Sequence, residues 1–480
     1  MYSSLRVQTF RGIVWSSLDR FSAQGIQFIL SFIIARRLEP SDYGLIAMLG
    51  IFMALAQTFI DSGFSNALIQ KQERTEVDYS TVFYFNIGIG VILYGILYLL
   101  APFIADFYNQ PLLEDLIAWV GLNFVIYAFS TIQRTKLIIE LDFKRQAFIS
   151  IIAVVVSGIV AVWMAYNGYG VWTLVVQGLL NNVIILILLW FSAHWLPLWI
   201  FSKQSFKELF GFGSKLLGGS ILHTIYINIY TLIIGKFFSS IELGCYNRSY
   251  TITQYPSSNI TTILTRVTYP IECRMQDDNE RLQEKYFLFI RLTAFCVFPM
   301  MIGLAAVADP LIRIVLTDKW LLCVPYLRIM CLAYMWDPIM RMTWDLLNVK
   351  SRSDYSLKSE IVKKVTAFIV LLITIPLGVE MMCVGLVCYT FADLIIVSQY
   401  TKKILPRVVF LEIVKELFPV LCLSLAMGGI VYFIQFLINV LWLQLLSGII
   451  IGIFFYIGIA CVMKFKEQRI IGELLMNLWH

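Results

Sequence analysis

Charged residues are scarce in this chain of 480 residues. Asp, Glu, Lys and Arg make up 14% of it, against 59% hydrophobic residues, and the mean hydropathy is +0.78. Soluble globular domains carry about 25% charged residues, so an ordinary soluble fold is excluded. Apolar runs of about 20 residues recur along the whole chain, and they lack the alternation of barrel strands. The composition therefore predicts an all-α membrane protein that crosses the bilayer many times.

Residues that carry chemistry are scarce as well. The nine cysteines form no CxxC motif and only three histidines are present, so neither a metal site nor a disulfide framework is expected. The HExxH, GxSxG and phosphate-binding glycine motifs are missing, and the sequence predicts no enzyme and no cofactor. The net charge of +6 comes from loops between apolar runs. Membrane topology explains it there, and no nucleic-acid partner is expected.

Apolar segments of membrane-spanning length can be placed along most of the chain. The segment 247–269 is the most polar of them, with Pro256 in its middle and Arg266 near its end. Lipid would not tolerate such a face, so we expect this segment to line the interior of the bundle. The sequence predicts about fourteen spans, at approximately 12–34, 45–66, 80–104, 115–134, 147–166, 170–192, 212–235, 247–269, 287–308, 322–346, 361–379, 382–401, 417–438 and 441–463.

Lys and Arg residues alternate in number between the loops that these spans define. With the N-terminus placed inside, 25 of the 37 basic residues lie in inner segments, seven in outer segments and five within spans. Basic residues accumulate on the cytoplasmic side of membrane proteins. The pattern therefore supports fourteen spans, with the N- and C-termini both cytoplasmic.

The chain shows signs of an internal duplication. Residues 35–44, ARRLEPSDYG, align with residues 235–244, GKFFSSIELG, and the alignment pairs basic with basic, acidic with acidic and glycine with glycine. Such repeats are common in transporters. We expect an N-terminal six-helix lobe (1–192), a cytoplasmic connecting loop (193–211), a C-terminal six-helix lobe (212–401) and a last part with a linker, two further spans and a cytoplasmic tail (402–480).

Three stretches near the N-terminus carry a family resemblance. Ile33–Gly44 reads IIARRLEPSDYG, Asp61–Gln70 reads DSGFSNALIQ, and Asp78–Tyr84 opens the third span. They resemble motifs of the polysaccharide flippases of the MOP superfamily, the Wzx-type polysaccharide transport family, and the span count matches its colanic-acid-exporter-like branch. Residues after position 200 contribute only the layout of spans. Asp61 lies near a helix end, where we expect it to cap the next segment rather than bind an ion.

The resemblance implies a fold and a function. Two pseudo-symmetric six-helix lobes would surround a central cavity, with two extra helices at the C-terminus. The protein would move an undecaprenyl-diphosphate-linked oligosaccharide, the repeat unit of an O-antigen, capsule or exopolysaccharide, across the bacterial inner membrane by alternating access. The lipid-linked oligosaccharide and membrane lipids are then its expected partners, together with a glycan polymerase and other assembly proteins.

Basic residues within the expected spans are the candidate substrate-binding residues. The cargo that the resemblance implies has an anionic diphosphate, which fixed cations can hold. The candidates are Arg20, Lys215, Arg266, Arg291 and Arg341. Lys215, Arg266 and Arg291 lie near the cytoplasmic ends of their spans, and their side chains could instead extend to the membrane surface. Arg20 and Arg341 lie deeper, which favours a place in the cavity.

Acidic residues form a second group of candidates. Asp337, Arg341 and Asp345 follow one another at i, i+4 and i+8, which puts them on one stripe of a helix. The stripe is either a structural ladder of compensating charges or a site for a coupling cation or the glycan. Asp19 precedes Arg20 but points about 100° away around the helix, so it needs another partner. If transport is coupled to an ion, the sequence leaves both Na⁺ and H⁺ gradients open.

Two other functions stay open. A multidrug exporter of the same superfamily would usually have twelve spans and acidic sites for cationic drugs, whereas the charges expected inside this protein are at least as basic as acidic. A membrane glycan polymerase or ligase would need a sizeable external loop, and no expected outer loop exceeds about a dozen residues. The glycan, the coupling ion and the oligomeric state are not specified by the sequence.

The basic-residue pattern makes a testable prediction about topology. A reporter fused after His480 should lie in the cytoplasm, and one inserted between Asn167 and Gly168 should lie in the periplasm, because the loops around them differ in basic content. Alkaline phosphatase and fluorescent-protein fusions measure both positions. A periplasmic signal at the C-terminus would mean that the number of spans is odd.

Overall fold

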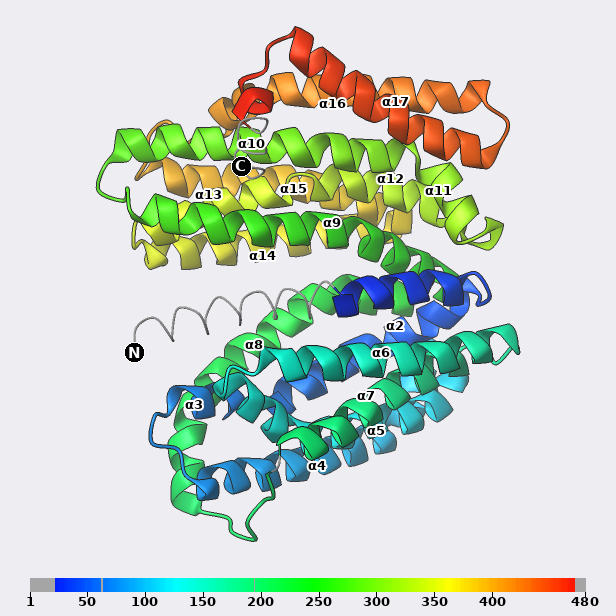
Figure 1. Cartoon of the computed structure of the whole chain (residues 1–480), viewed down its shortest axis with the longest axis vertical. Helices are drawn as coiled ribbons and strands as arrows, with labels where there is room; N and C mark the ends of the chain where they lie inside the picture. Colours follow the sequence, from blue (N-terminus) through cyan, green and yellow to red (C-terminus); the bar gives the residue numbers. More distant parts are fainter. Residues whose placement is uncertain (1–21, 62–63, 194, 471–480) are drawn as a thin grey trace. The chain divides into compact units, whose positions relative to one another are not determined.

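A computed structural model describes residues 22–61, 64–193 and 195–470 (Figure 1). All regular secondary structure in these ranges is helical. By their internal contacts the residues form two compact units, Met1–Gly244 and Cys245–His480. The predicted all-α fold is confirmed.

The first described helix of the first unit is Ser22–Ala35. Within this unit, α4 and α5 pack along each other, α7 packs on α5 and α6, and α8 crosses α2. The helices that follow the first are α2 (Pro40–Asp61), α3 (Phe64–Gln70), α4 (Glu76–Tyr108), α5 (Leu112–Ile139), α6 (Phe143–Tyr166), α7 (Trp172–Ala193), α8 (Lys203–Phe237) and the first turn of α9 (Ser240–Cys273).

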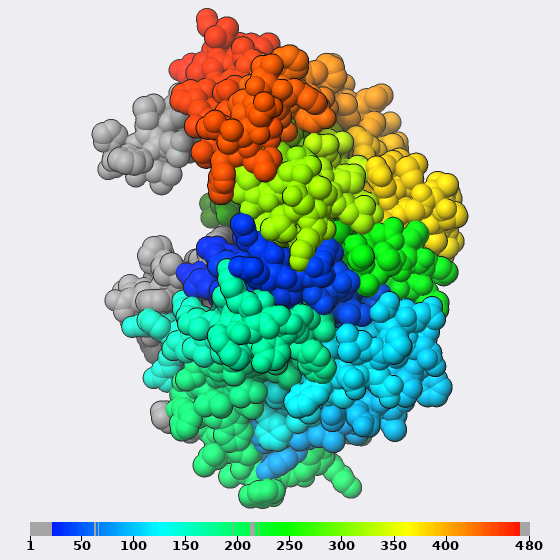
Figure 2. Space-filling model, turned by 90° about the vertical axis from the view of Figure 1, so that its right-hand side faces the viewer, coloured from blue at the N-terminus to red at the C-terminus, as the bar shows by residue number. Residues whose placement is uncertain are grey.

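The second unit contains the rest of α9 and all later helices. Its central packing joins α10 to α16, α12 and α13 to α15, and α14 to α15. The helix α17 packs on α16 and α11, and Figure 2 shows its orange-red surface beside the lime-green α11. The helices are α10 (Asn279–Ala306), α11 (Ala308–Val315), η1 (Asp318–Trp320), α12 (Cys323–Tyr334), α13 (Asp337–Val349), α14 (Ser353–Thr374), η2 (Ile375–Leu377), α15 (Val379–Lys402), α16 (Phe410–Leu437) and α17 (Leu441–Val462).

Ten of the described helices are long and apolar enough to cross a membrane, so the protein is a multi-pass membrane protein. These ten coincide with ten of the expected spans. The other four expected spans coincide with the helix Ser22–Ala35, the polar helix α9, the pair α12 and α13, and α14. Their described parts are shorter or more polar, and the count of fourteen stays a prediction.

The two compact units do not divide at the connecting loop that the sequence favours. The predicted loop 193–211 is largely helical, because α8 already begins at Lys203. In addition, α8 packs on α2, α3 and α4, and the hydroxyls of Thr58 and Thr224 lie 3.1 Å apart. These contacts place α8 with the first unit. The predicted lobes are defined by the repeat in the sequence, whereas the two units are defined by their internal contacts. The predicted lobes therefore stay a prediction.

The two aligned turns of the sequence adopt the same local structure. The backbone N–H of Glu39 donates to a carboxylate oxygen of Asp42 at 3.0 Å, and the N–H of Ser239 donates to Glu242 at 3.0 Å. In both cases an acidic side chain three residues on satisfies a free N–H at a helix start. The acidic positions that the repeat pairs therefore have the same role in α2 and α9.

The same turns contact each other through their glycines. A Cβ added at Gly44 would overlap the carbonyl oxygen of Ser240, and a Cβ added at Gly244 would overlap that of Pro40. The two contacts are related by the 200-residue offset, as a local twofold axis requires. Only glycine lets the first turn of α2 and the first turn of α9 approach so closely.

This crossing makes a prediction about stability. Gly44→Ala and Gly244→Ala should each force the two helix starts apart, with the cost of about 1–3 kcal/mol that is typical of overpacking. Thermal unfolding of the purified protein should therefore occur at a lower temperature. Gly50→Ala is the matched control on α2, because a Cβ there meets no atom within 4 Å. Equal unfolding temperatures for all three variants would contradict the crossing.

Candidate functional site

A polar cavity of ≈ 350 Å³ lies among α2, α3, α5 and α8 in the first unit. Its wall combines hydroxyl groups with one acidic and one basic side chain. Such a wall can hold a hydrated or anionic group inside an otherwise apolar bundle. The lining residues are Thr58, Asp61, Ser65, Tyr127, Thr131, Arg134, Thr135, Ile138, Leu217 and Ser220.

The helix α5 supplies half of this wall. Tyr127, Thr131, Arg134, Thr135 and Ile138 are spaced by three and four residues, which places them on one face of the helix. The Thr131 hydroxyl donates to the Tyr127 carbonyl at 2.9 Å, and the Thr135 hydroxyl donates to the Thr131 carbonyl at 2.9 Å. These bonds satisfy the hydroxyl protons, so the oxygen lone pairs remain available as acceptors.

Asp61 lies at the end of α2 beside this face. Its carboxylate accepts a hydrogen bond from the Tyr127 hydroxyl at 2.8 Å, and it lines the cavity. The sequence favoured a capping role for Asp61. The structure connects Asp61 to α5 and places its carboxylate in the wall of the cavity. Residues 62–63, which lead to the next helix, lie outside the described residues, so the capping role stays a prediction.

Arg134 is the basic residue of the cavity. Its side chain is half-buried and acts on the charge of Asp61, but it forms no hydrogen bond or ion pair with another described residue. Sequence analysis missed it because it closes the expected span 115–134 and was counted as a loop residue, whereas α5 continues to Ile139. The spacing from Tyr127 to Ile138 was the signal that could have found it. A guanidinium with open donors suits an anionic group such as a phosphate.

In the second unit, the expected span 322–346 is broken into α12 and α13. Pro338 has no N–H with which to bond the carbonyl of Tyr334 four residues before it. The Ser257 hydroxyl of α9 donates to this carbonyl at 2.9 Å instead. The break leaves Asp337 at the start of α13, where the helix dipole favours a carboxylate. Discontinuous helices of this kind often border transport sites.

The predicted acidic stripe lies on α13, below this break. The Nε atom of Arg341 lies 3.4 Å from an oxygen of Asp345, so this part of the stripe forms the expected i, i+4 pair. Asp337 experiences the positive charges of Arg341 and of Lys363 on α14. Lys363 in turn lies 3.2 Å from the buried Asp393 of α15. The charges on α13, α14 and α15 therefore compensate one another.

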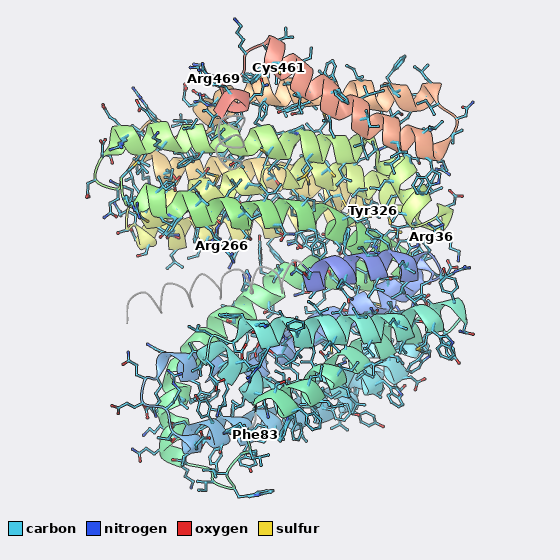
Figure 3. All side chains as sticks on the ribbon, in the orientation of Figure 1. Arg36, Phe83, Arg266, Tyr326, Cys461 and Arg469 are labelled. Atoms are coloured by element: carbon cyan, nitrogen blue, oxygen red, sulfur yellow. The ribbon has the colours of Figure 1, made fainter. Side chains whose placement is uncertain are left out.

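The other predicted site residues have different surroundings. Arg291 pairs with Glu416 at 2.7 Å and with Glu467 at 3.3 Å, which ties α10 to α16 and to the segment after α17. Arg266 projects outward from α9 and is exposed, with no hydrogen bond or ion pair to another described residue (Figure 3). Asp19, Arg20 and the Lys215 side chain lie outside the described residues. The substrate-binding roles of all these residues stay predictions.

Comparison with solved structures defines the class of the fold. The structure is similar to the lipid II flippase MurJ in an inward closed conformation, with a TM-score of 0.73 and 14% identity, covering 94% of this chain and 98% of that one. It is also similar to an inward-facing multidrug resistance MATE family transporter of the MOP superfamily, with a TM-score of 0.61 and 15% identity over 83% and 98%. The fold is that of MOP-superfamily transporters.

Sequence comparison gives the family. The chain belongs to the polysaccharide biosynthesis protein family, whose family model matches residues 33–325. Three relatives support this. Lipopolysaccharide biosynthesis protein WzxC of Escherichia coli (strain K12) is 27% identical over 75% of this chain and 74% of its own length. Teichuronic acid biosynthesis protein TuaB of Bacillus subtilis (strain 168) is 29% identical over 73% of both chains, and succinoglycan biosynthesis transport protein ExoT of Rhizobium meliloti (strain 1021) is 23% identical over 67% and 65%. The predicted family is confirmed.

The cavity makes a prediction about Arg134. In a strain without the native protein, the Arg134→Ala variant should restore at least ten-fold less surface polysaccharide than the unmodified protein does. The reason is that the cavity loses its only cation among the described lining residues. Arg134→Lys should retain part of the activity, since the charge is kept and the bidentate geometry is lost. Quantitative sugar analysis of washed cells, with the amount of protein in the membrane measured in parallel, checks both.

Arg145→Ala is the matched control. Arg145 also lies on the inner side by the predicted topology, but it is more exposed and pairs with Asp142 at 3.0 Å. It should keep the polysaccharide at the level of the unmodified protein. If Arg134→Ala does the same at normal protein level, the cavity does not need its cation.

Proposed function

We propose that the protein is a transporter, and not an enzyme, that moves a lipid-linked oligosaccharide from the inner to the outer leaflet of the bacterial inner membrane. The observation that carries this proposal is membership of the polysaccharide biosynthesis family over residues 33–325. The relatives are named for the biosynthesis of lipopolysaccharide, teichuronic acid and succinoglycan, which are chemically different glycans, and one of them is named a transport protein. If the precursors of these glycans share a lipid carrier with a diphosphate linkage, one fold can transport all of them.

The physical task is to carry a charged and hydrated group through about 30 Å of hydrocarbon. A charge at the centre of the bilayer costs several kcal/mol unless polar partners replace its water. The hydroxyl-rich cavity with Arg134 supplies such partners in the first unit. We assign the diphosphate, or an acidic sugar next to it, to this cavity for part of the transport cycle.

Alternating access is the proposed mechanism. The pathway must be closed on one side while it is open on the other, and the close crossing of α2 and α9 at Gly44 and Gly244 is the proposed outer closure. The crossing is made of close backbone contacts between the two helix starts. A Na⁺ or H⁺ gradient is the proposed energy source. Asp337 and Asp393 are the candidate residues for binding the coupling ion. The proposed orientation has both chain ends in the cytoplasm. A glycan polymerase and other assembly proteins are the candidate protein partners.

Depletion of the protein tests this function. Cells without it should accumulate lipid-linked oligosaccharide on the cytoplasmic leaflet and lose the corresponding surface polysaccharide, because synthesis continues while translocation stops. Mass spectrometry of extracted lipids and lectin labelling of intact cells and of inverted vesicles measure the amount and the leaflet.

A drug-accumulation assay is the contrasting arm. Ethidium retention should be unchanged by depletion if the cargo is a lipid-linked glycan. Altered retention with normal lipid-linked intermediates would instead identify a multidrug exporter of the same fold.

A further inference from the structure

The short segment 195–201 joins α7 to α8 and is unusually apolar on its outside. It reads WLPLWIF, and the exposed fractions are 74% for Leu196 and 94% for Trp199, with Ile200 and Phe201 about half exposed. From the sequence, this segment is expected to be part of a soluble connecting loop. Contiguous apolar side chains on a surface indicate that something covers them.

The segment is held rigidly against α4. The N–H of Leu198 donates to the Ser80 hydroxyl at 2.9 Å, and the N–H of Ser202 donates to the Thr81 hydroxyl at 3.0 Å. The Trp199 ring stacks on Tyr84, with ring centroids 6.0 Å apart. The outward position of the apolar side chains is therefore fixed by the fold.

Trp195 shows where the segment turns from inside to outside. It is buried, its ring lies 5.6 Å from that of Phe83, and its indole N–H donates to Glu76 (Figure 3 labels Phe83 on α4). The residues after Trp195 could have packed inward in the same way. The fold instead directs Leu196 and Trp199 away from the protein.

The contacts with α4 place the segment near the start of a spanning helix. Ser80 and Thr81 lie four and five residues after the start of a spanning helix, which is about 6–8 Å along its axis. The start of α4 carries a capping box of Thr75 and Asp78, and Lys71 lies 3.1 Å from Asp78, which marks the aqueous side. Interfacial segments lie about 5–10 Å into the boundary between headgroups and acyl chains.

The surroundings of the segment contain basic residues that can contact an anionic lipid surface, together with the exposed Glu208. Lys203 and Lys207 follow the segment directly on the exposed start of α8. Lys136 lies 3.6 Å from Glu76 and 5.6 Å from the centre of the Trp195 ring. Basic residues next to aromatic ones are typical of contacts with the cytoplasmic leaflet.

We propose that residues 196–201 insert into the headgroup region of the inner leaflet and hold the start of α8 at the membrane surface. The partner is the lipid bilayer itself, and the proposal does not depend on the cargo. The choice of leaflet rests on the predicted topology. A soluble protein docked on the same residues is the competing outcome.

Fluorescence quenching in nanodiscs of phosphatidylethanolamine and phosphatidylglycerol tests the insertion. The signal of Trp199 is obtained as the difference between the unmodified protein and Trp199→Phe, a substitution that keeps an apolar ring and the fold. Lipids brominated high on the acyl chain should quench this difference signal by at least half, whereas aqueous acrylamide should quench it weakly. The converse result, strong acrylamide quenching without an effect of bromine, would overturn the proposal and favour a docked protein.

Trp195→Phe is the matched control within the same segment. Trp195 is buried, so its difference signal should respond little to either quencher. Should Trp199→Phe not yield folded protein, a nitroxide on Leu196→Cys replaces it, in a variant without the nine native cysteines and with Glu73→Cys as the aqueous reference. Greater collision with oxygen than with a water-soluble nickel complex at position 196, and the reverse at 73, supports insertion. Equal values at both positions contradict it.

Discussion

The constraint on which this structure depends is that hydrocarbon offers no hydrogen-bond partners. Backbone polar groups at membrane depth therefore need partners inside the protein. The hydroxyl protons of Thr131 and Thr135 are satisfied by carbonyls of their own helix, and the carbonyl that Pro338 cannot satisfy is bonded by Ser257. Polar side chains can therefore line a cavity and border a broken helix without lipid having to solvate them.

The same constraint explains why the repeat of the sequence is visible as a contact. At the starts of α2 and α9 the free backbone N–H groups are satisfied by Asp42 and Glu242. With these groups satisfied locally, the two helix starts can lie against each other with only glycine between them.

Much of the fold could be predicted from the sequence, because long apolar runs and basic loops are direct consequences of the bilayer. The site was harder to predict, because the sequence marks the end of a helix poorly when polar residues continue the helix beyond its apolar part. Arg134 was assigned to a loop for this reason, although α5 includes it. The break at Asp337 and Pro338 was missed because the apolar pattern continues through it. The outward exposure of the apolar side chains of segment 195–201 could not be predicted, because it becomes visible only in three dimensions.

The two units place their cations in different environments, and this difference bears on mechanism. Arg341, Lys363 and Arg291 of the second unit each lie near a carboxylate, so binding an anion at these residues would first require an ion pair to open. Arg266 of the same unit is exposed and forms no ion pair with a described residue. Arg134 of the first unit forms no ion pair with a described residue, although Asp61 lines the same cavity, and its guanidinium donors are open to an anion there. A cation or proton arriving in the second unit would instead compete with Lys363 for Asp393. We infer that the first unit is the better place for the anionic part of the cargo, and that the second is the better place for an ion that drives its movement.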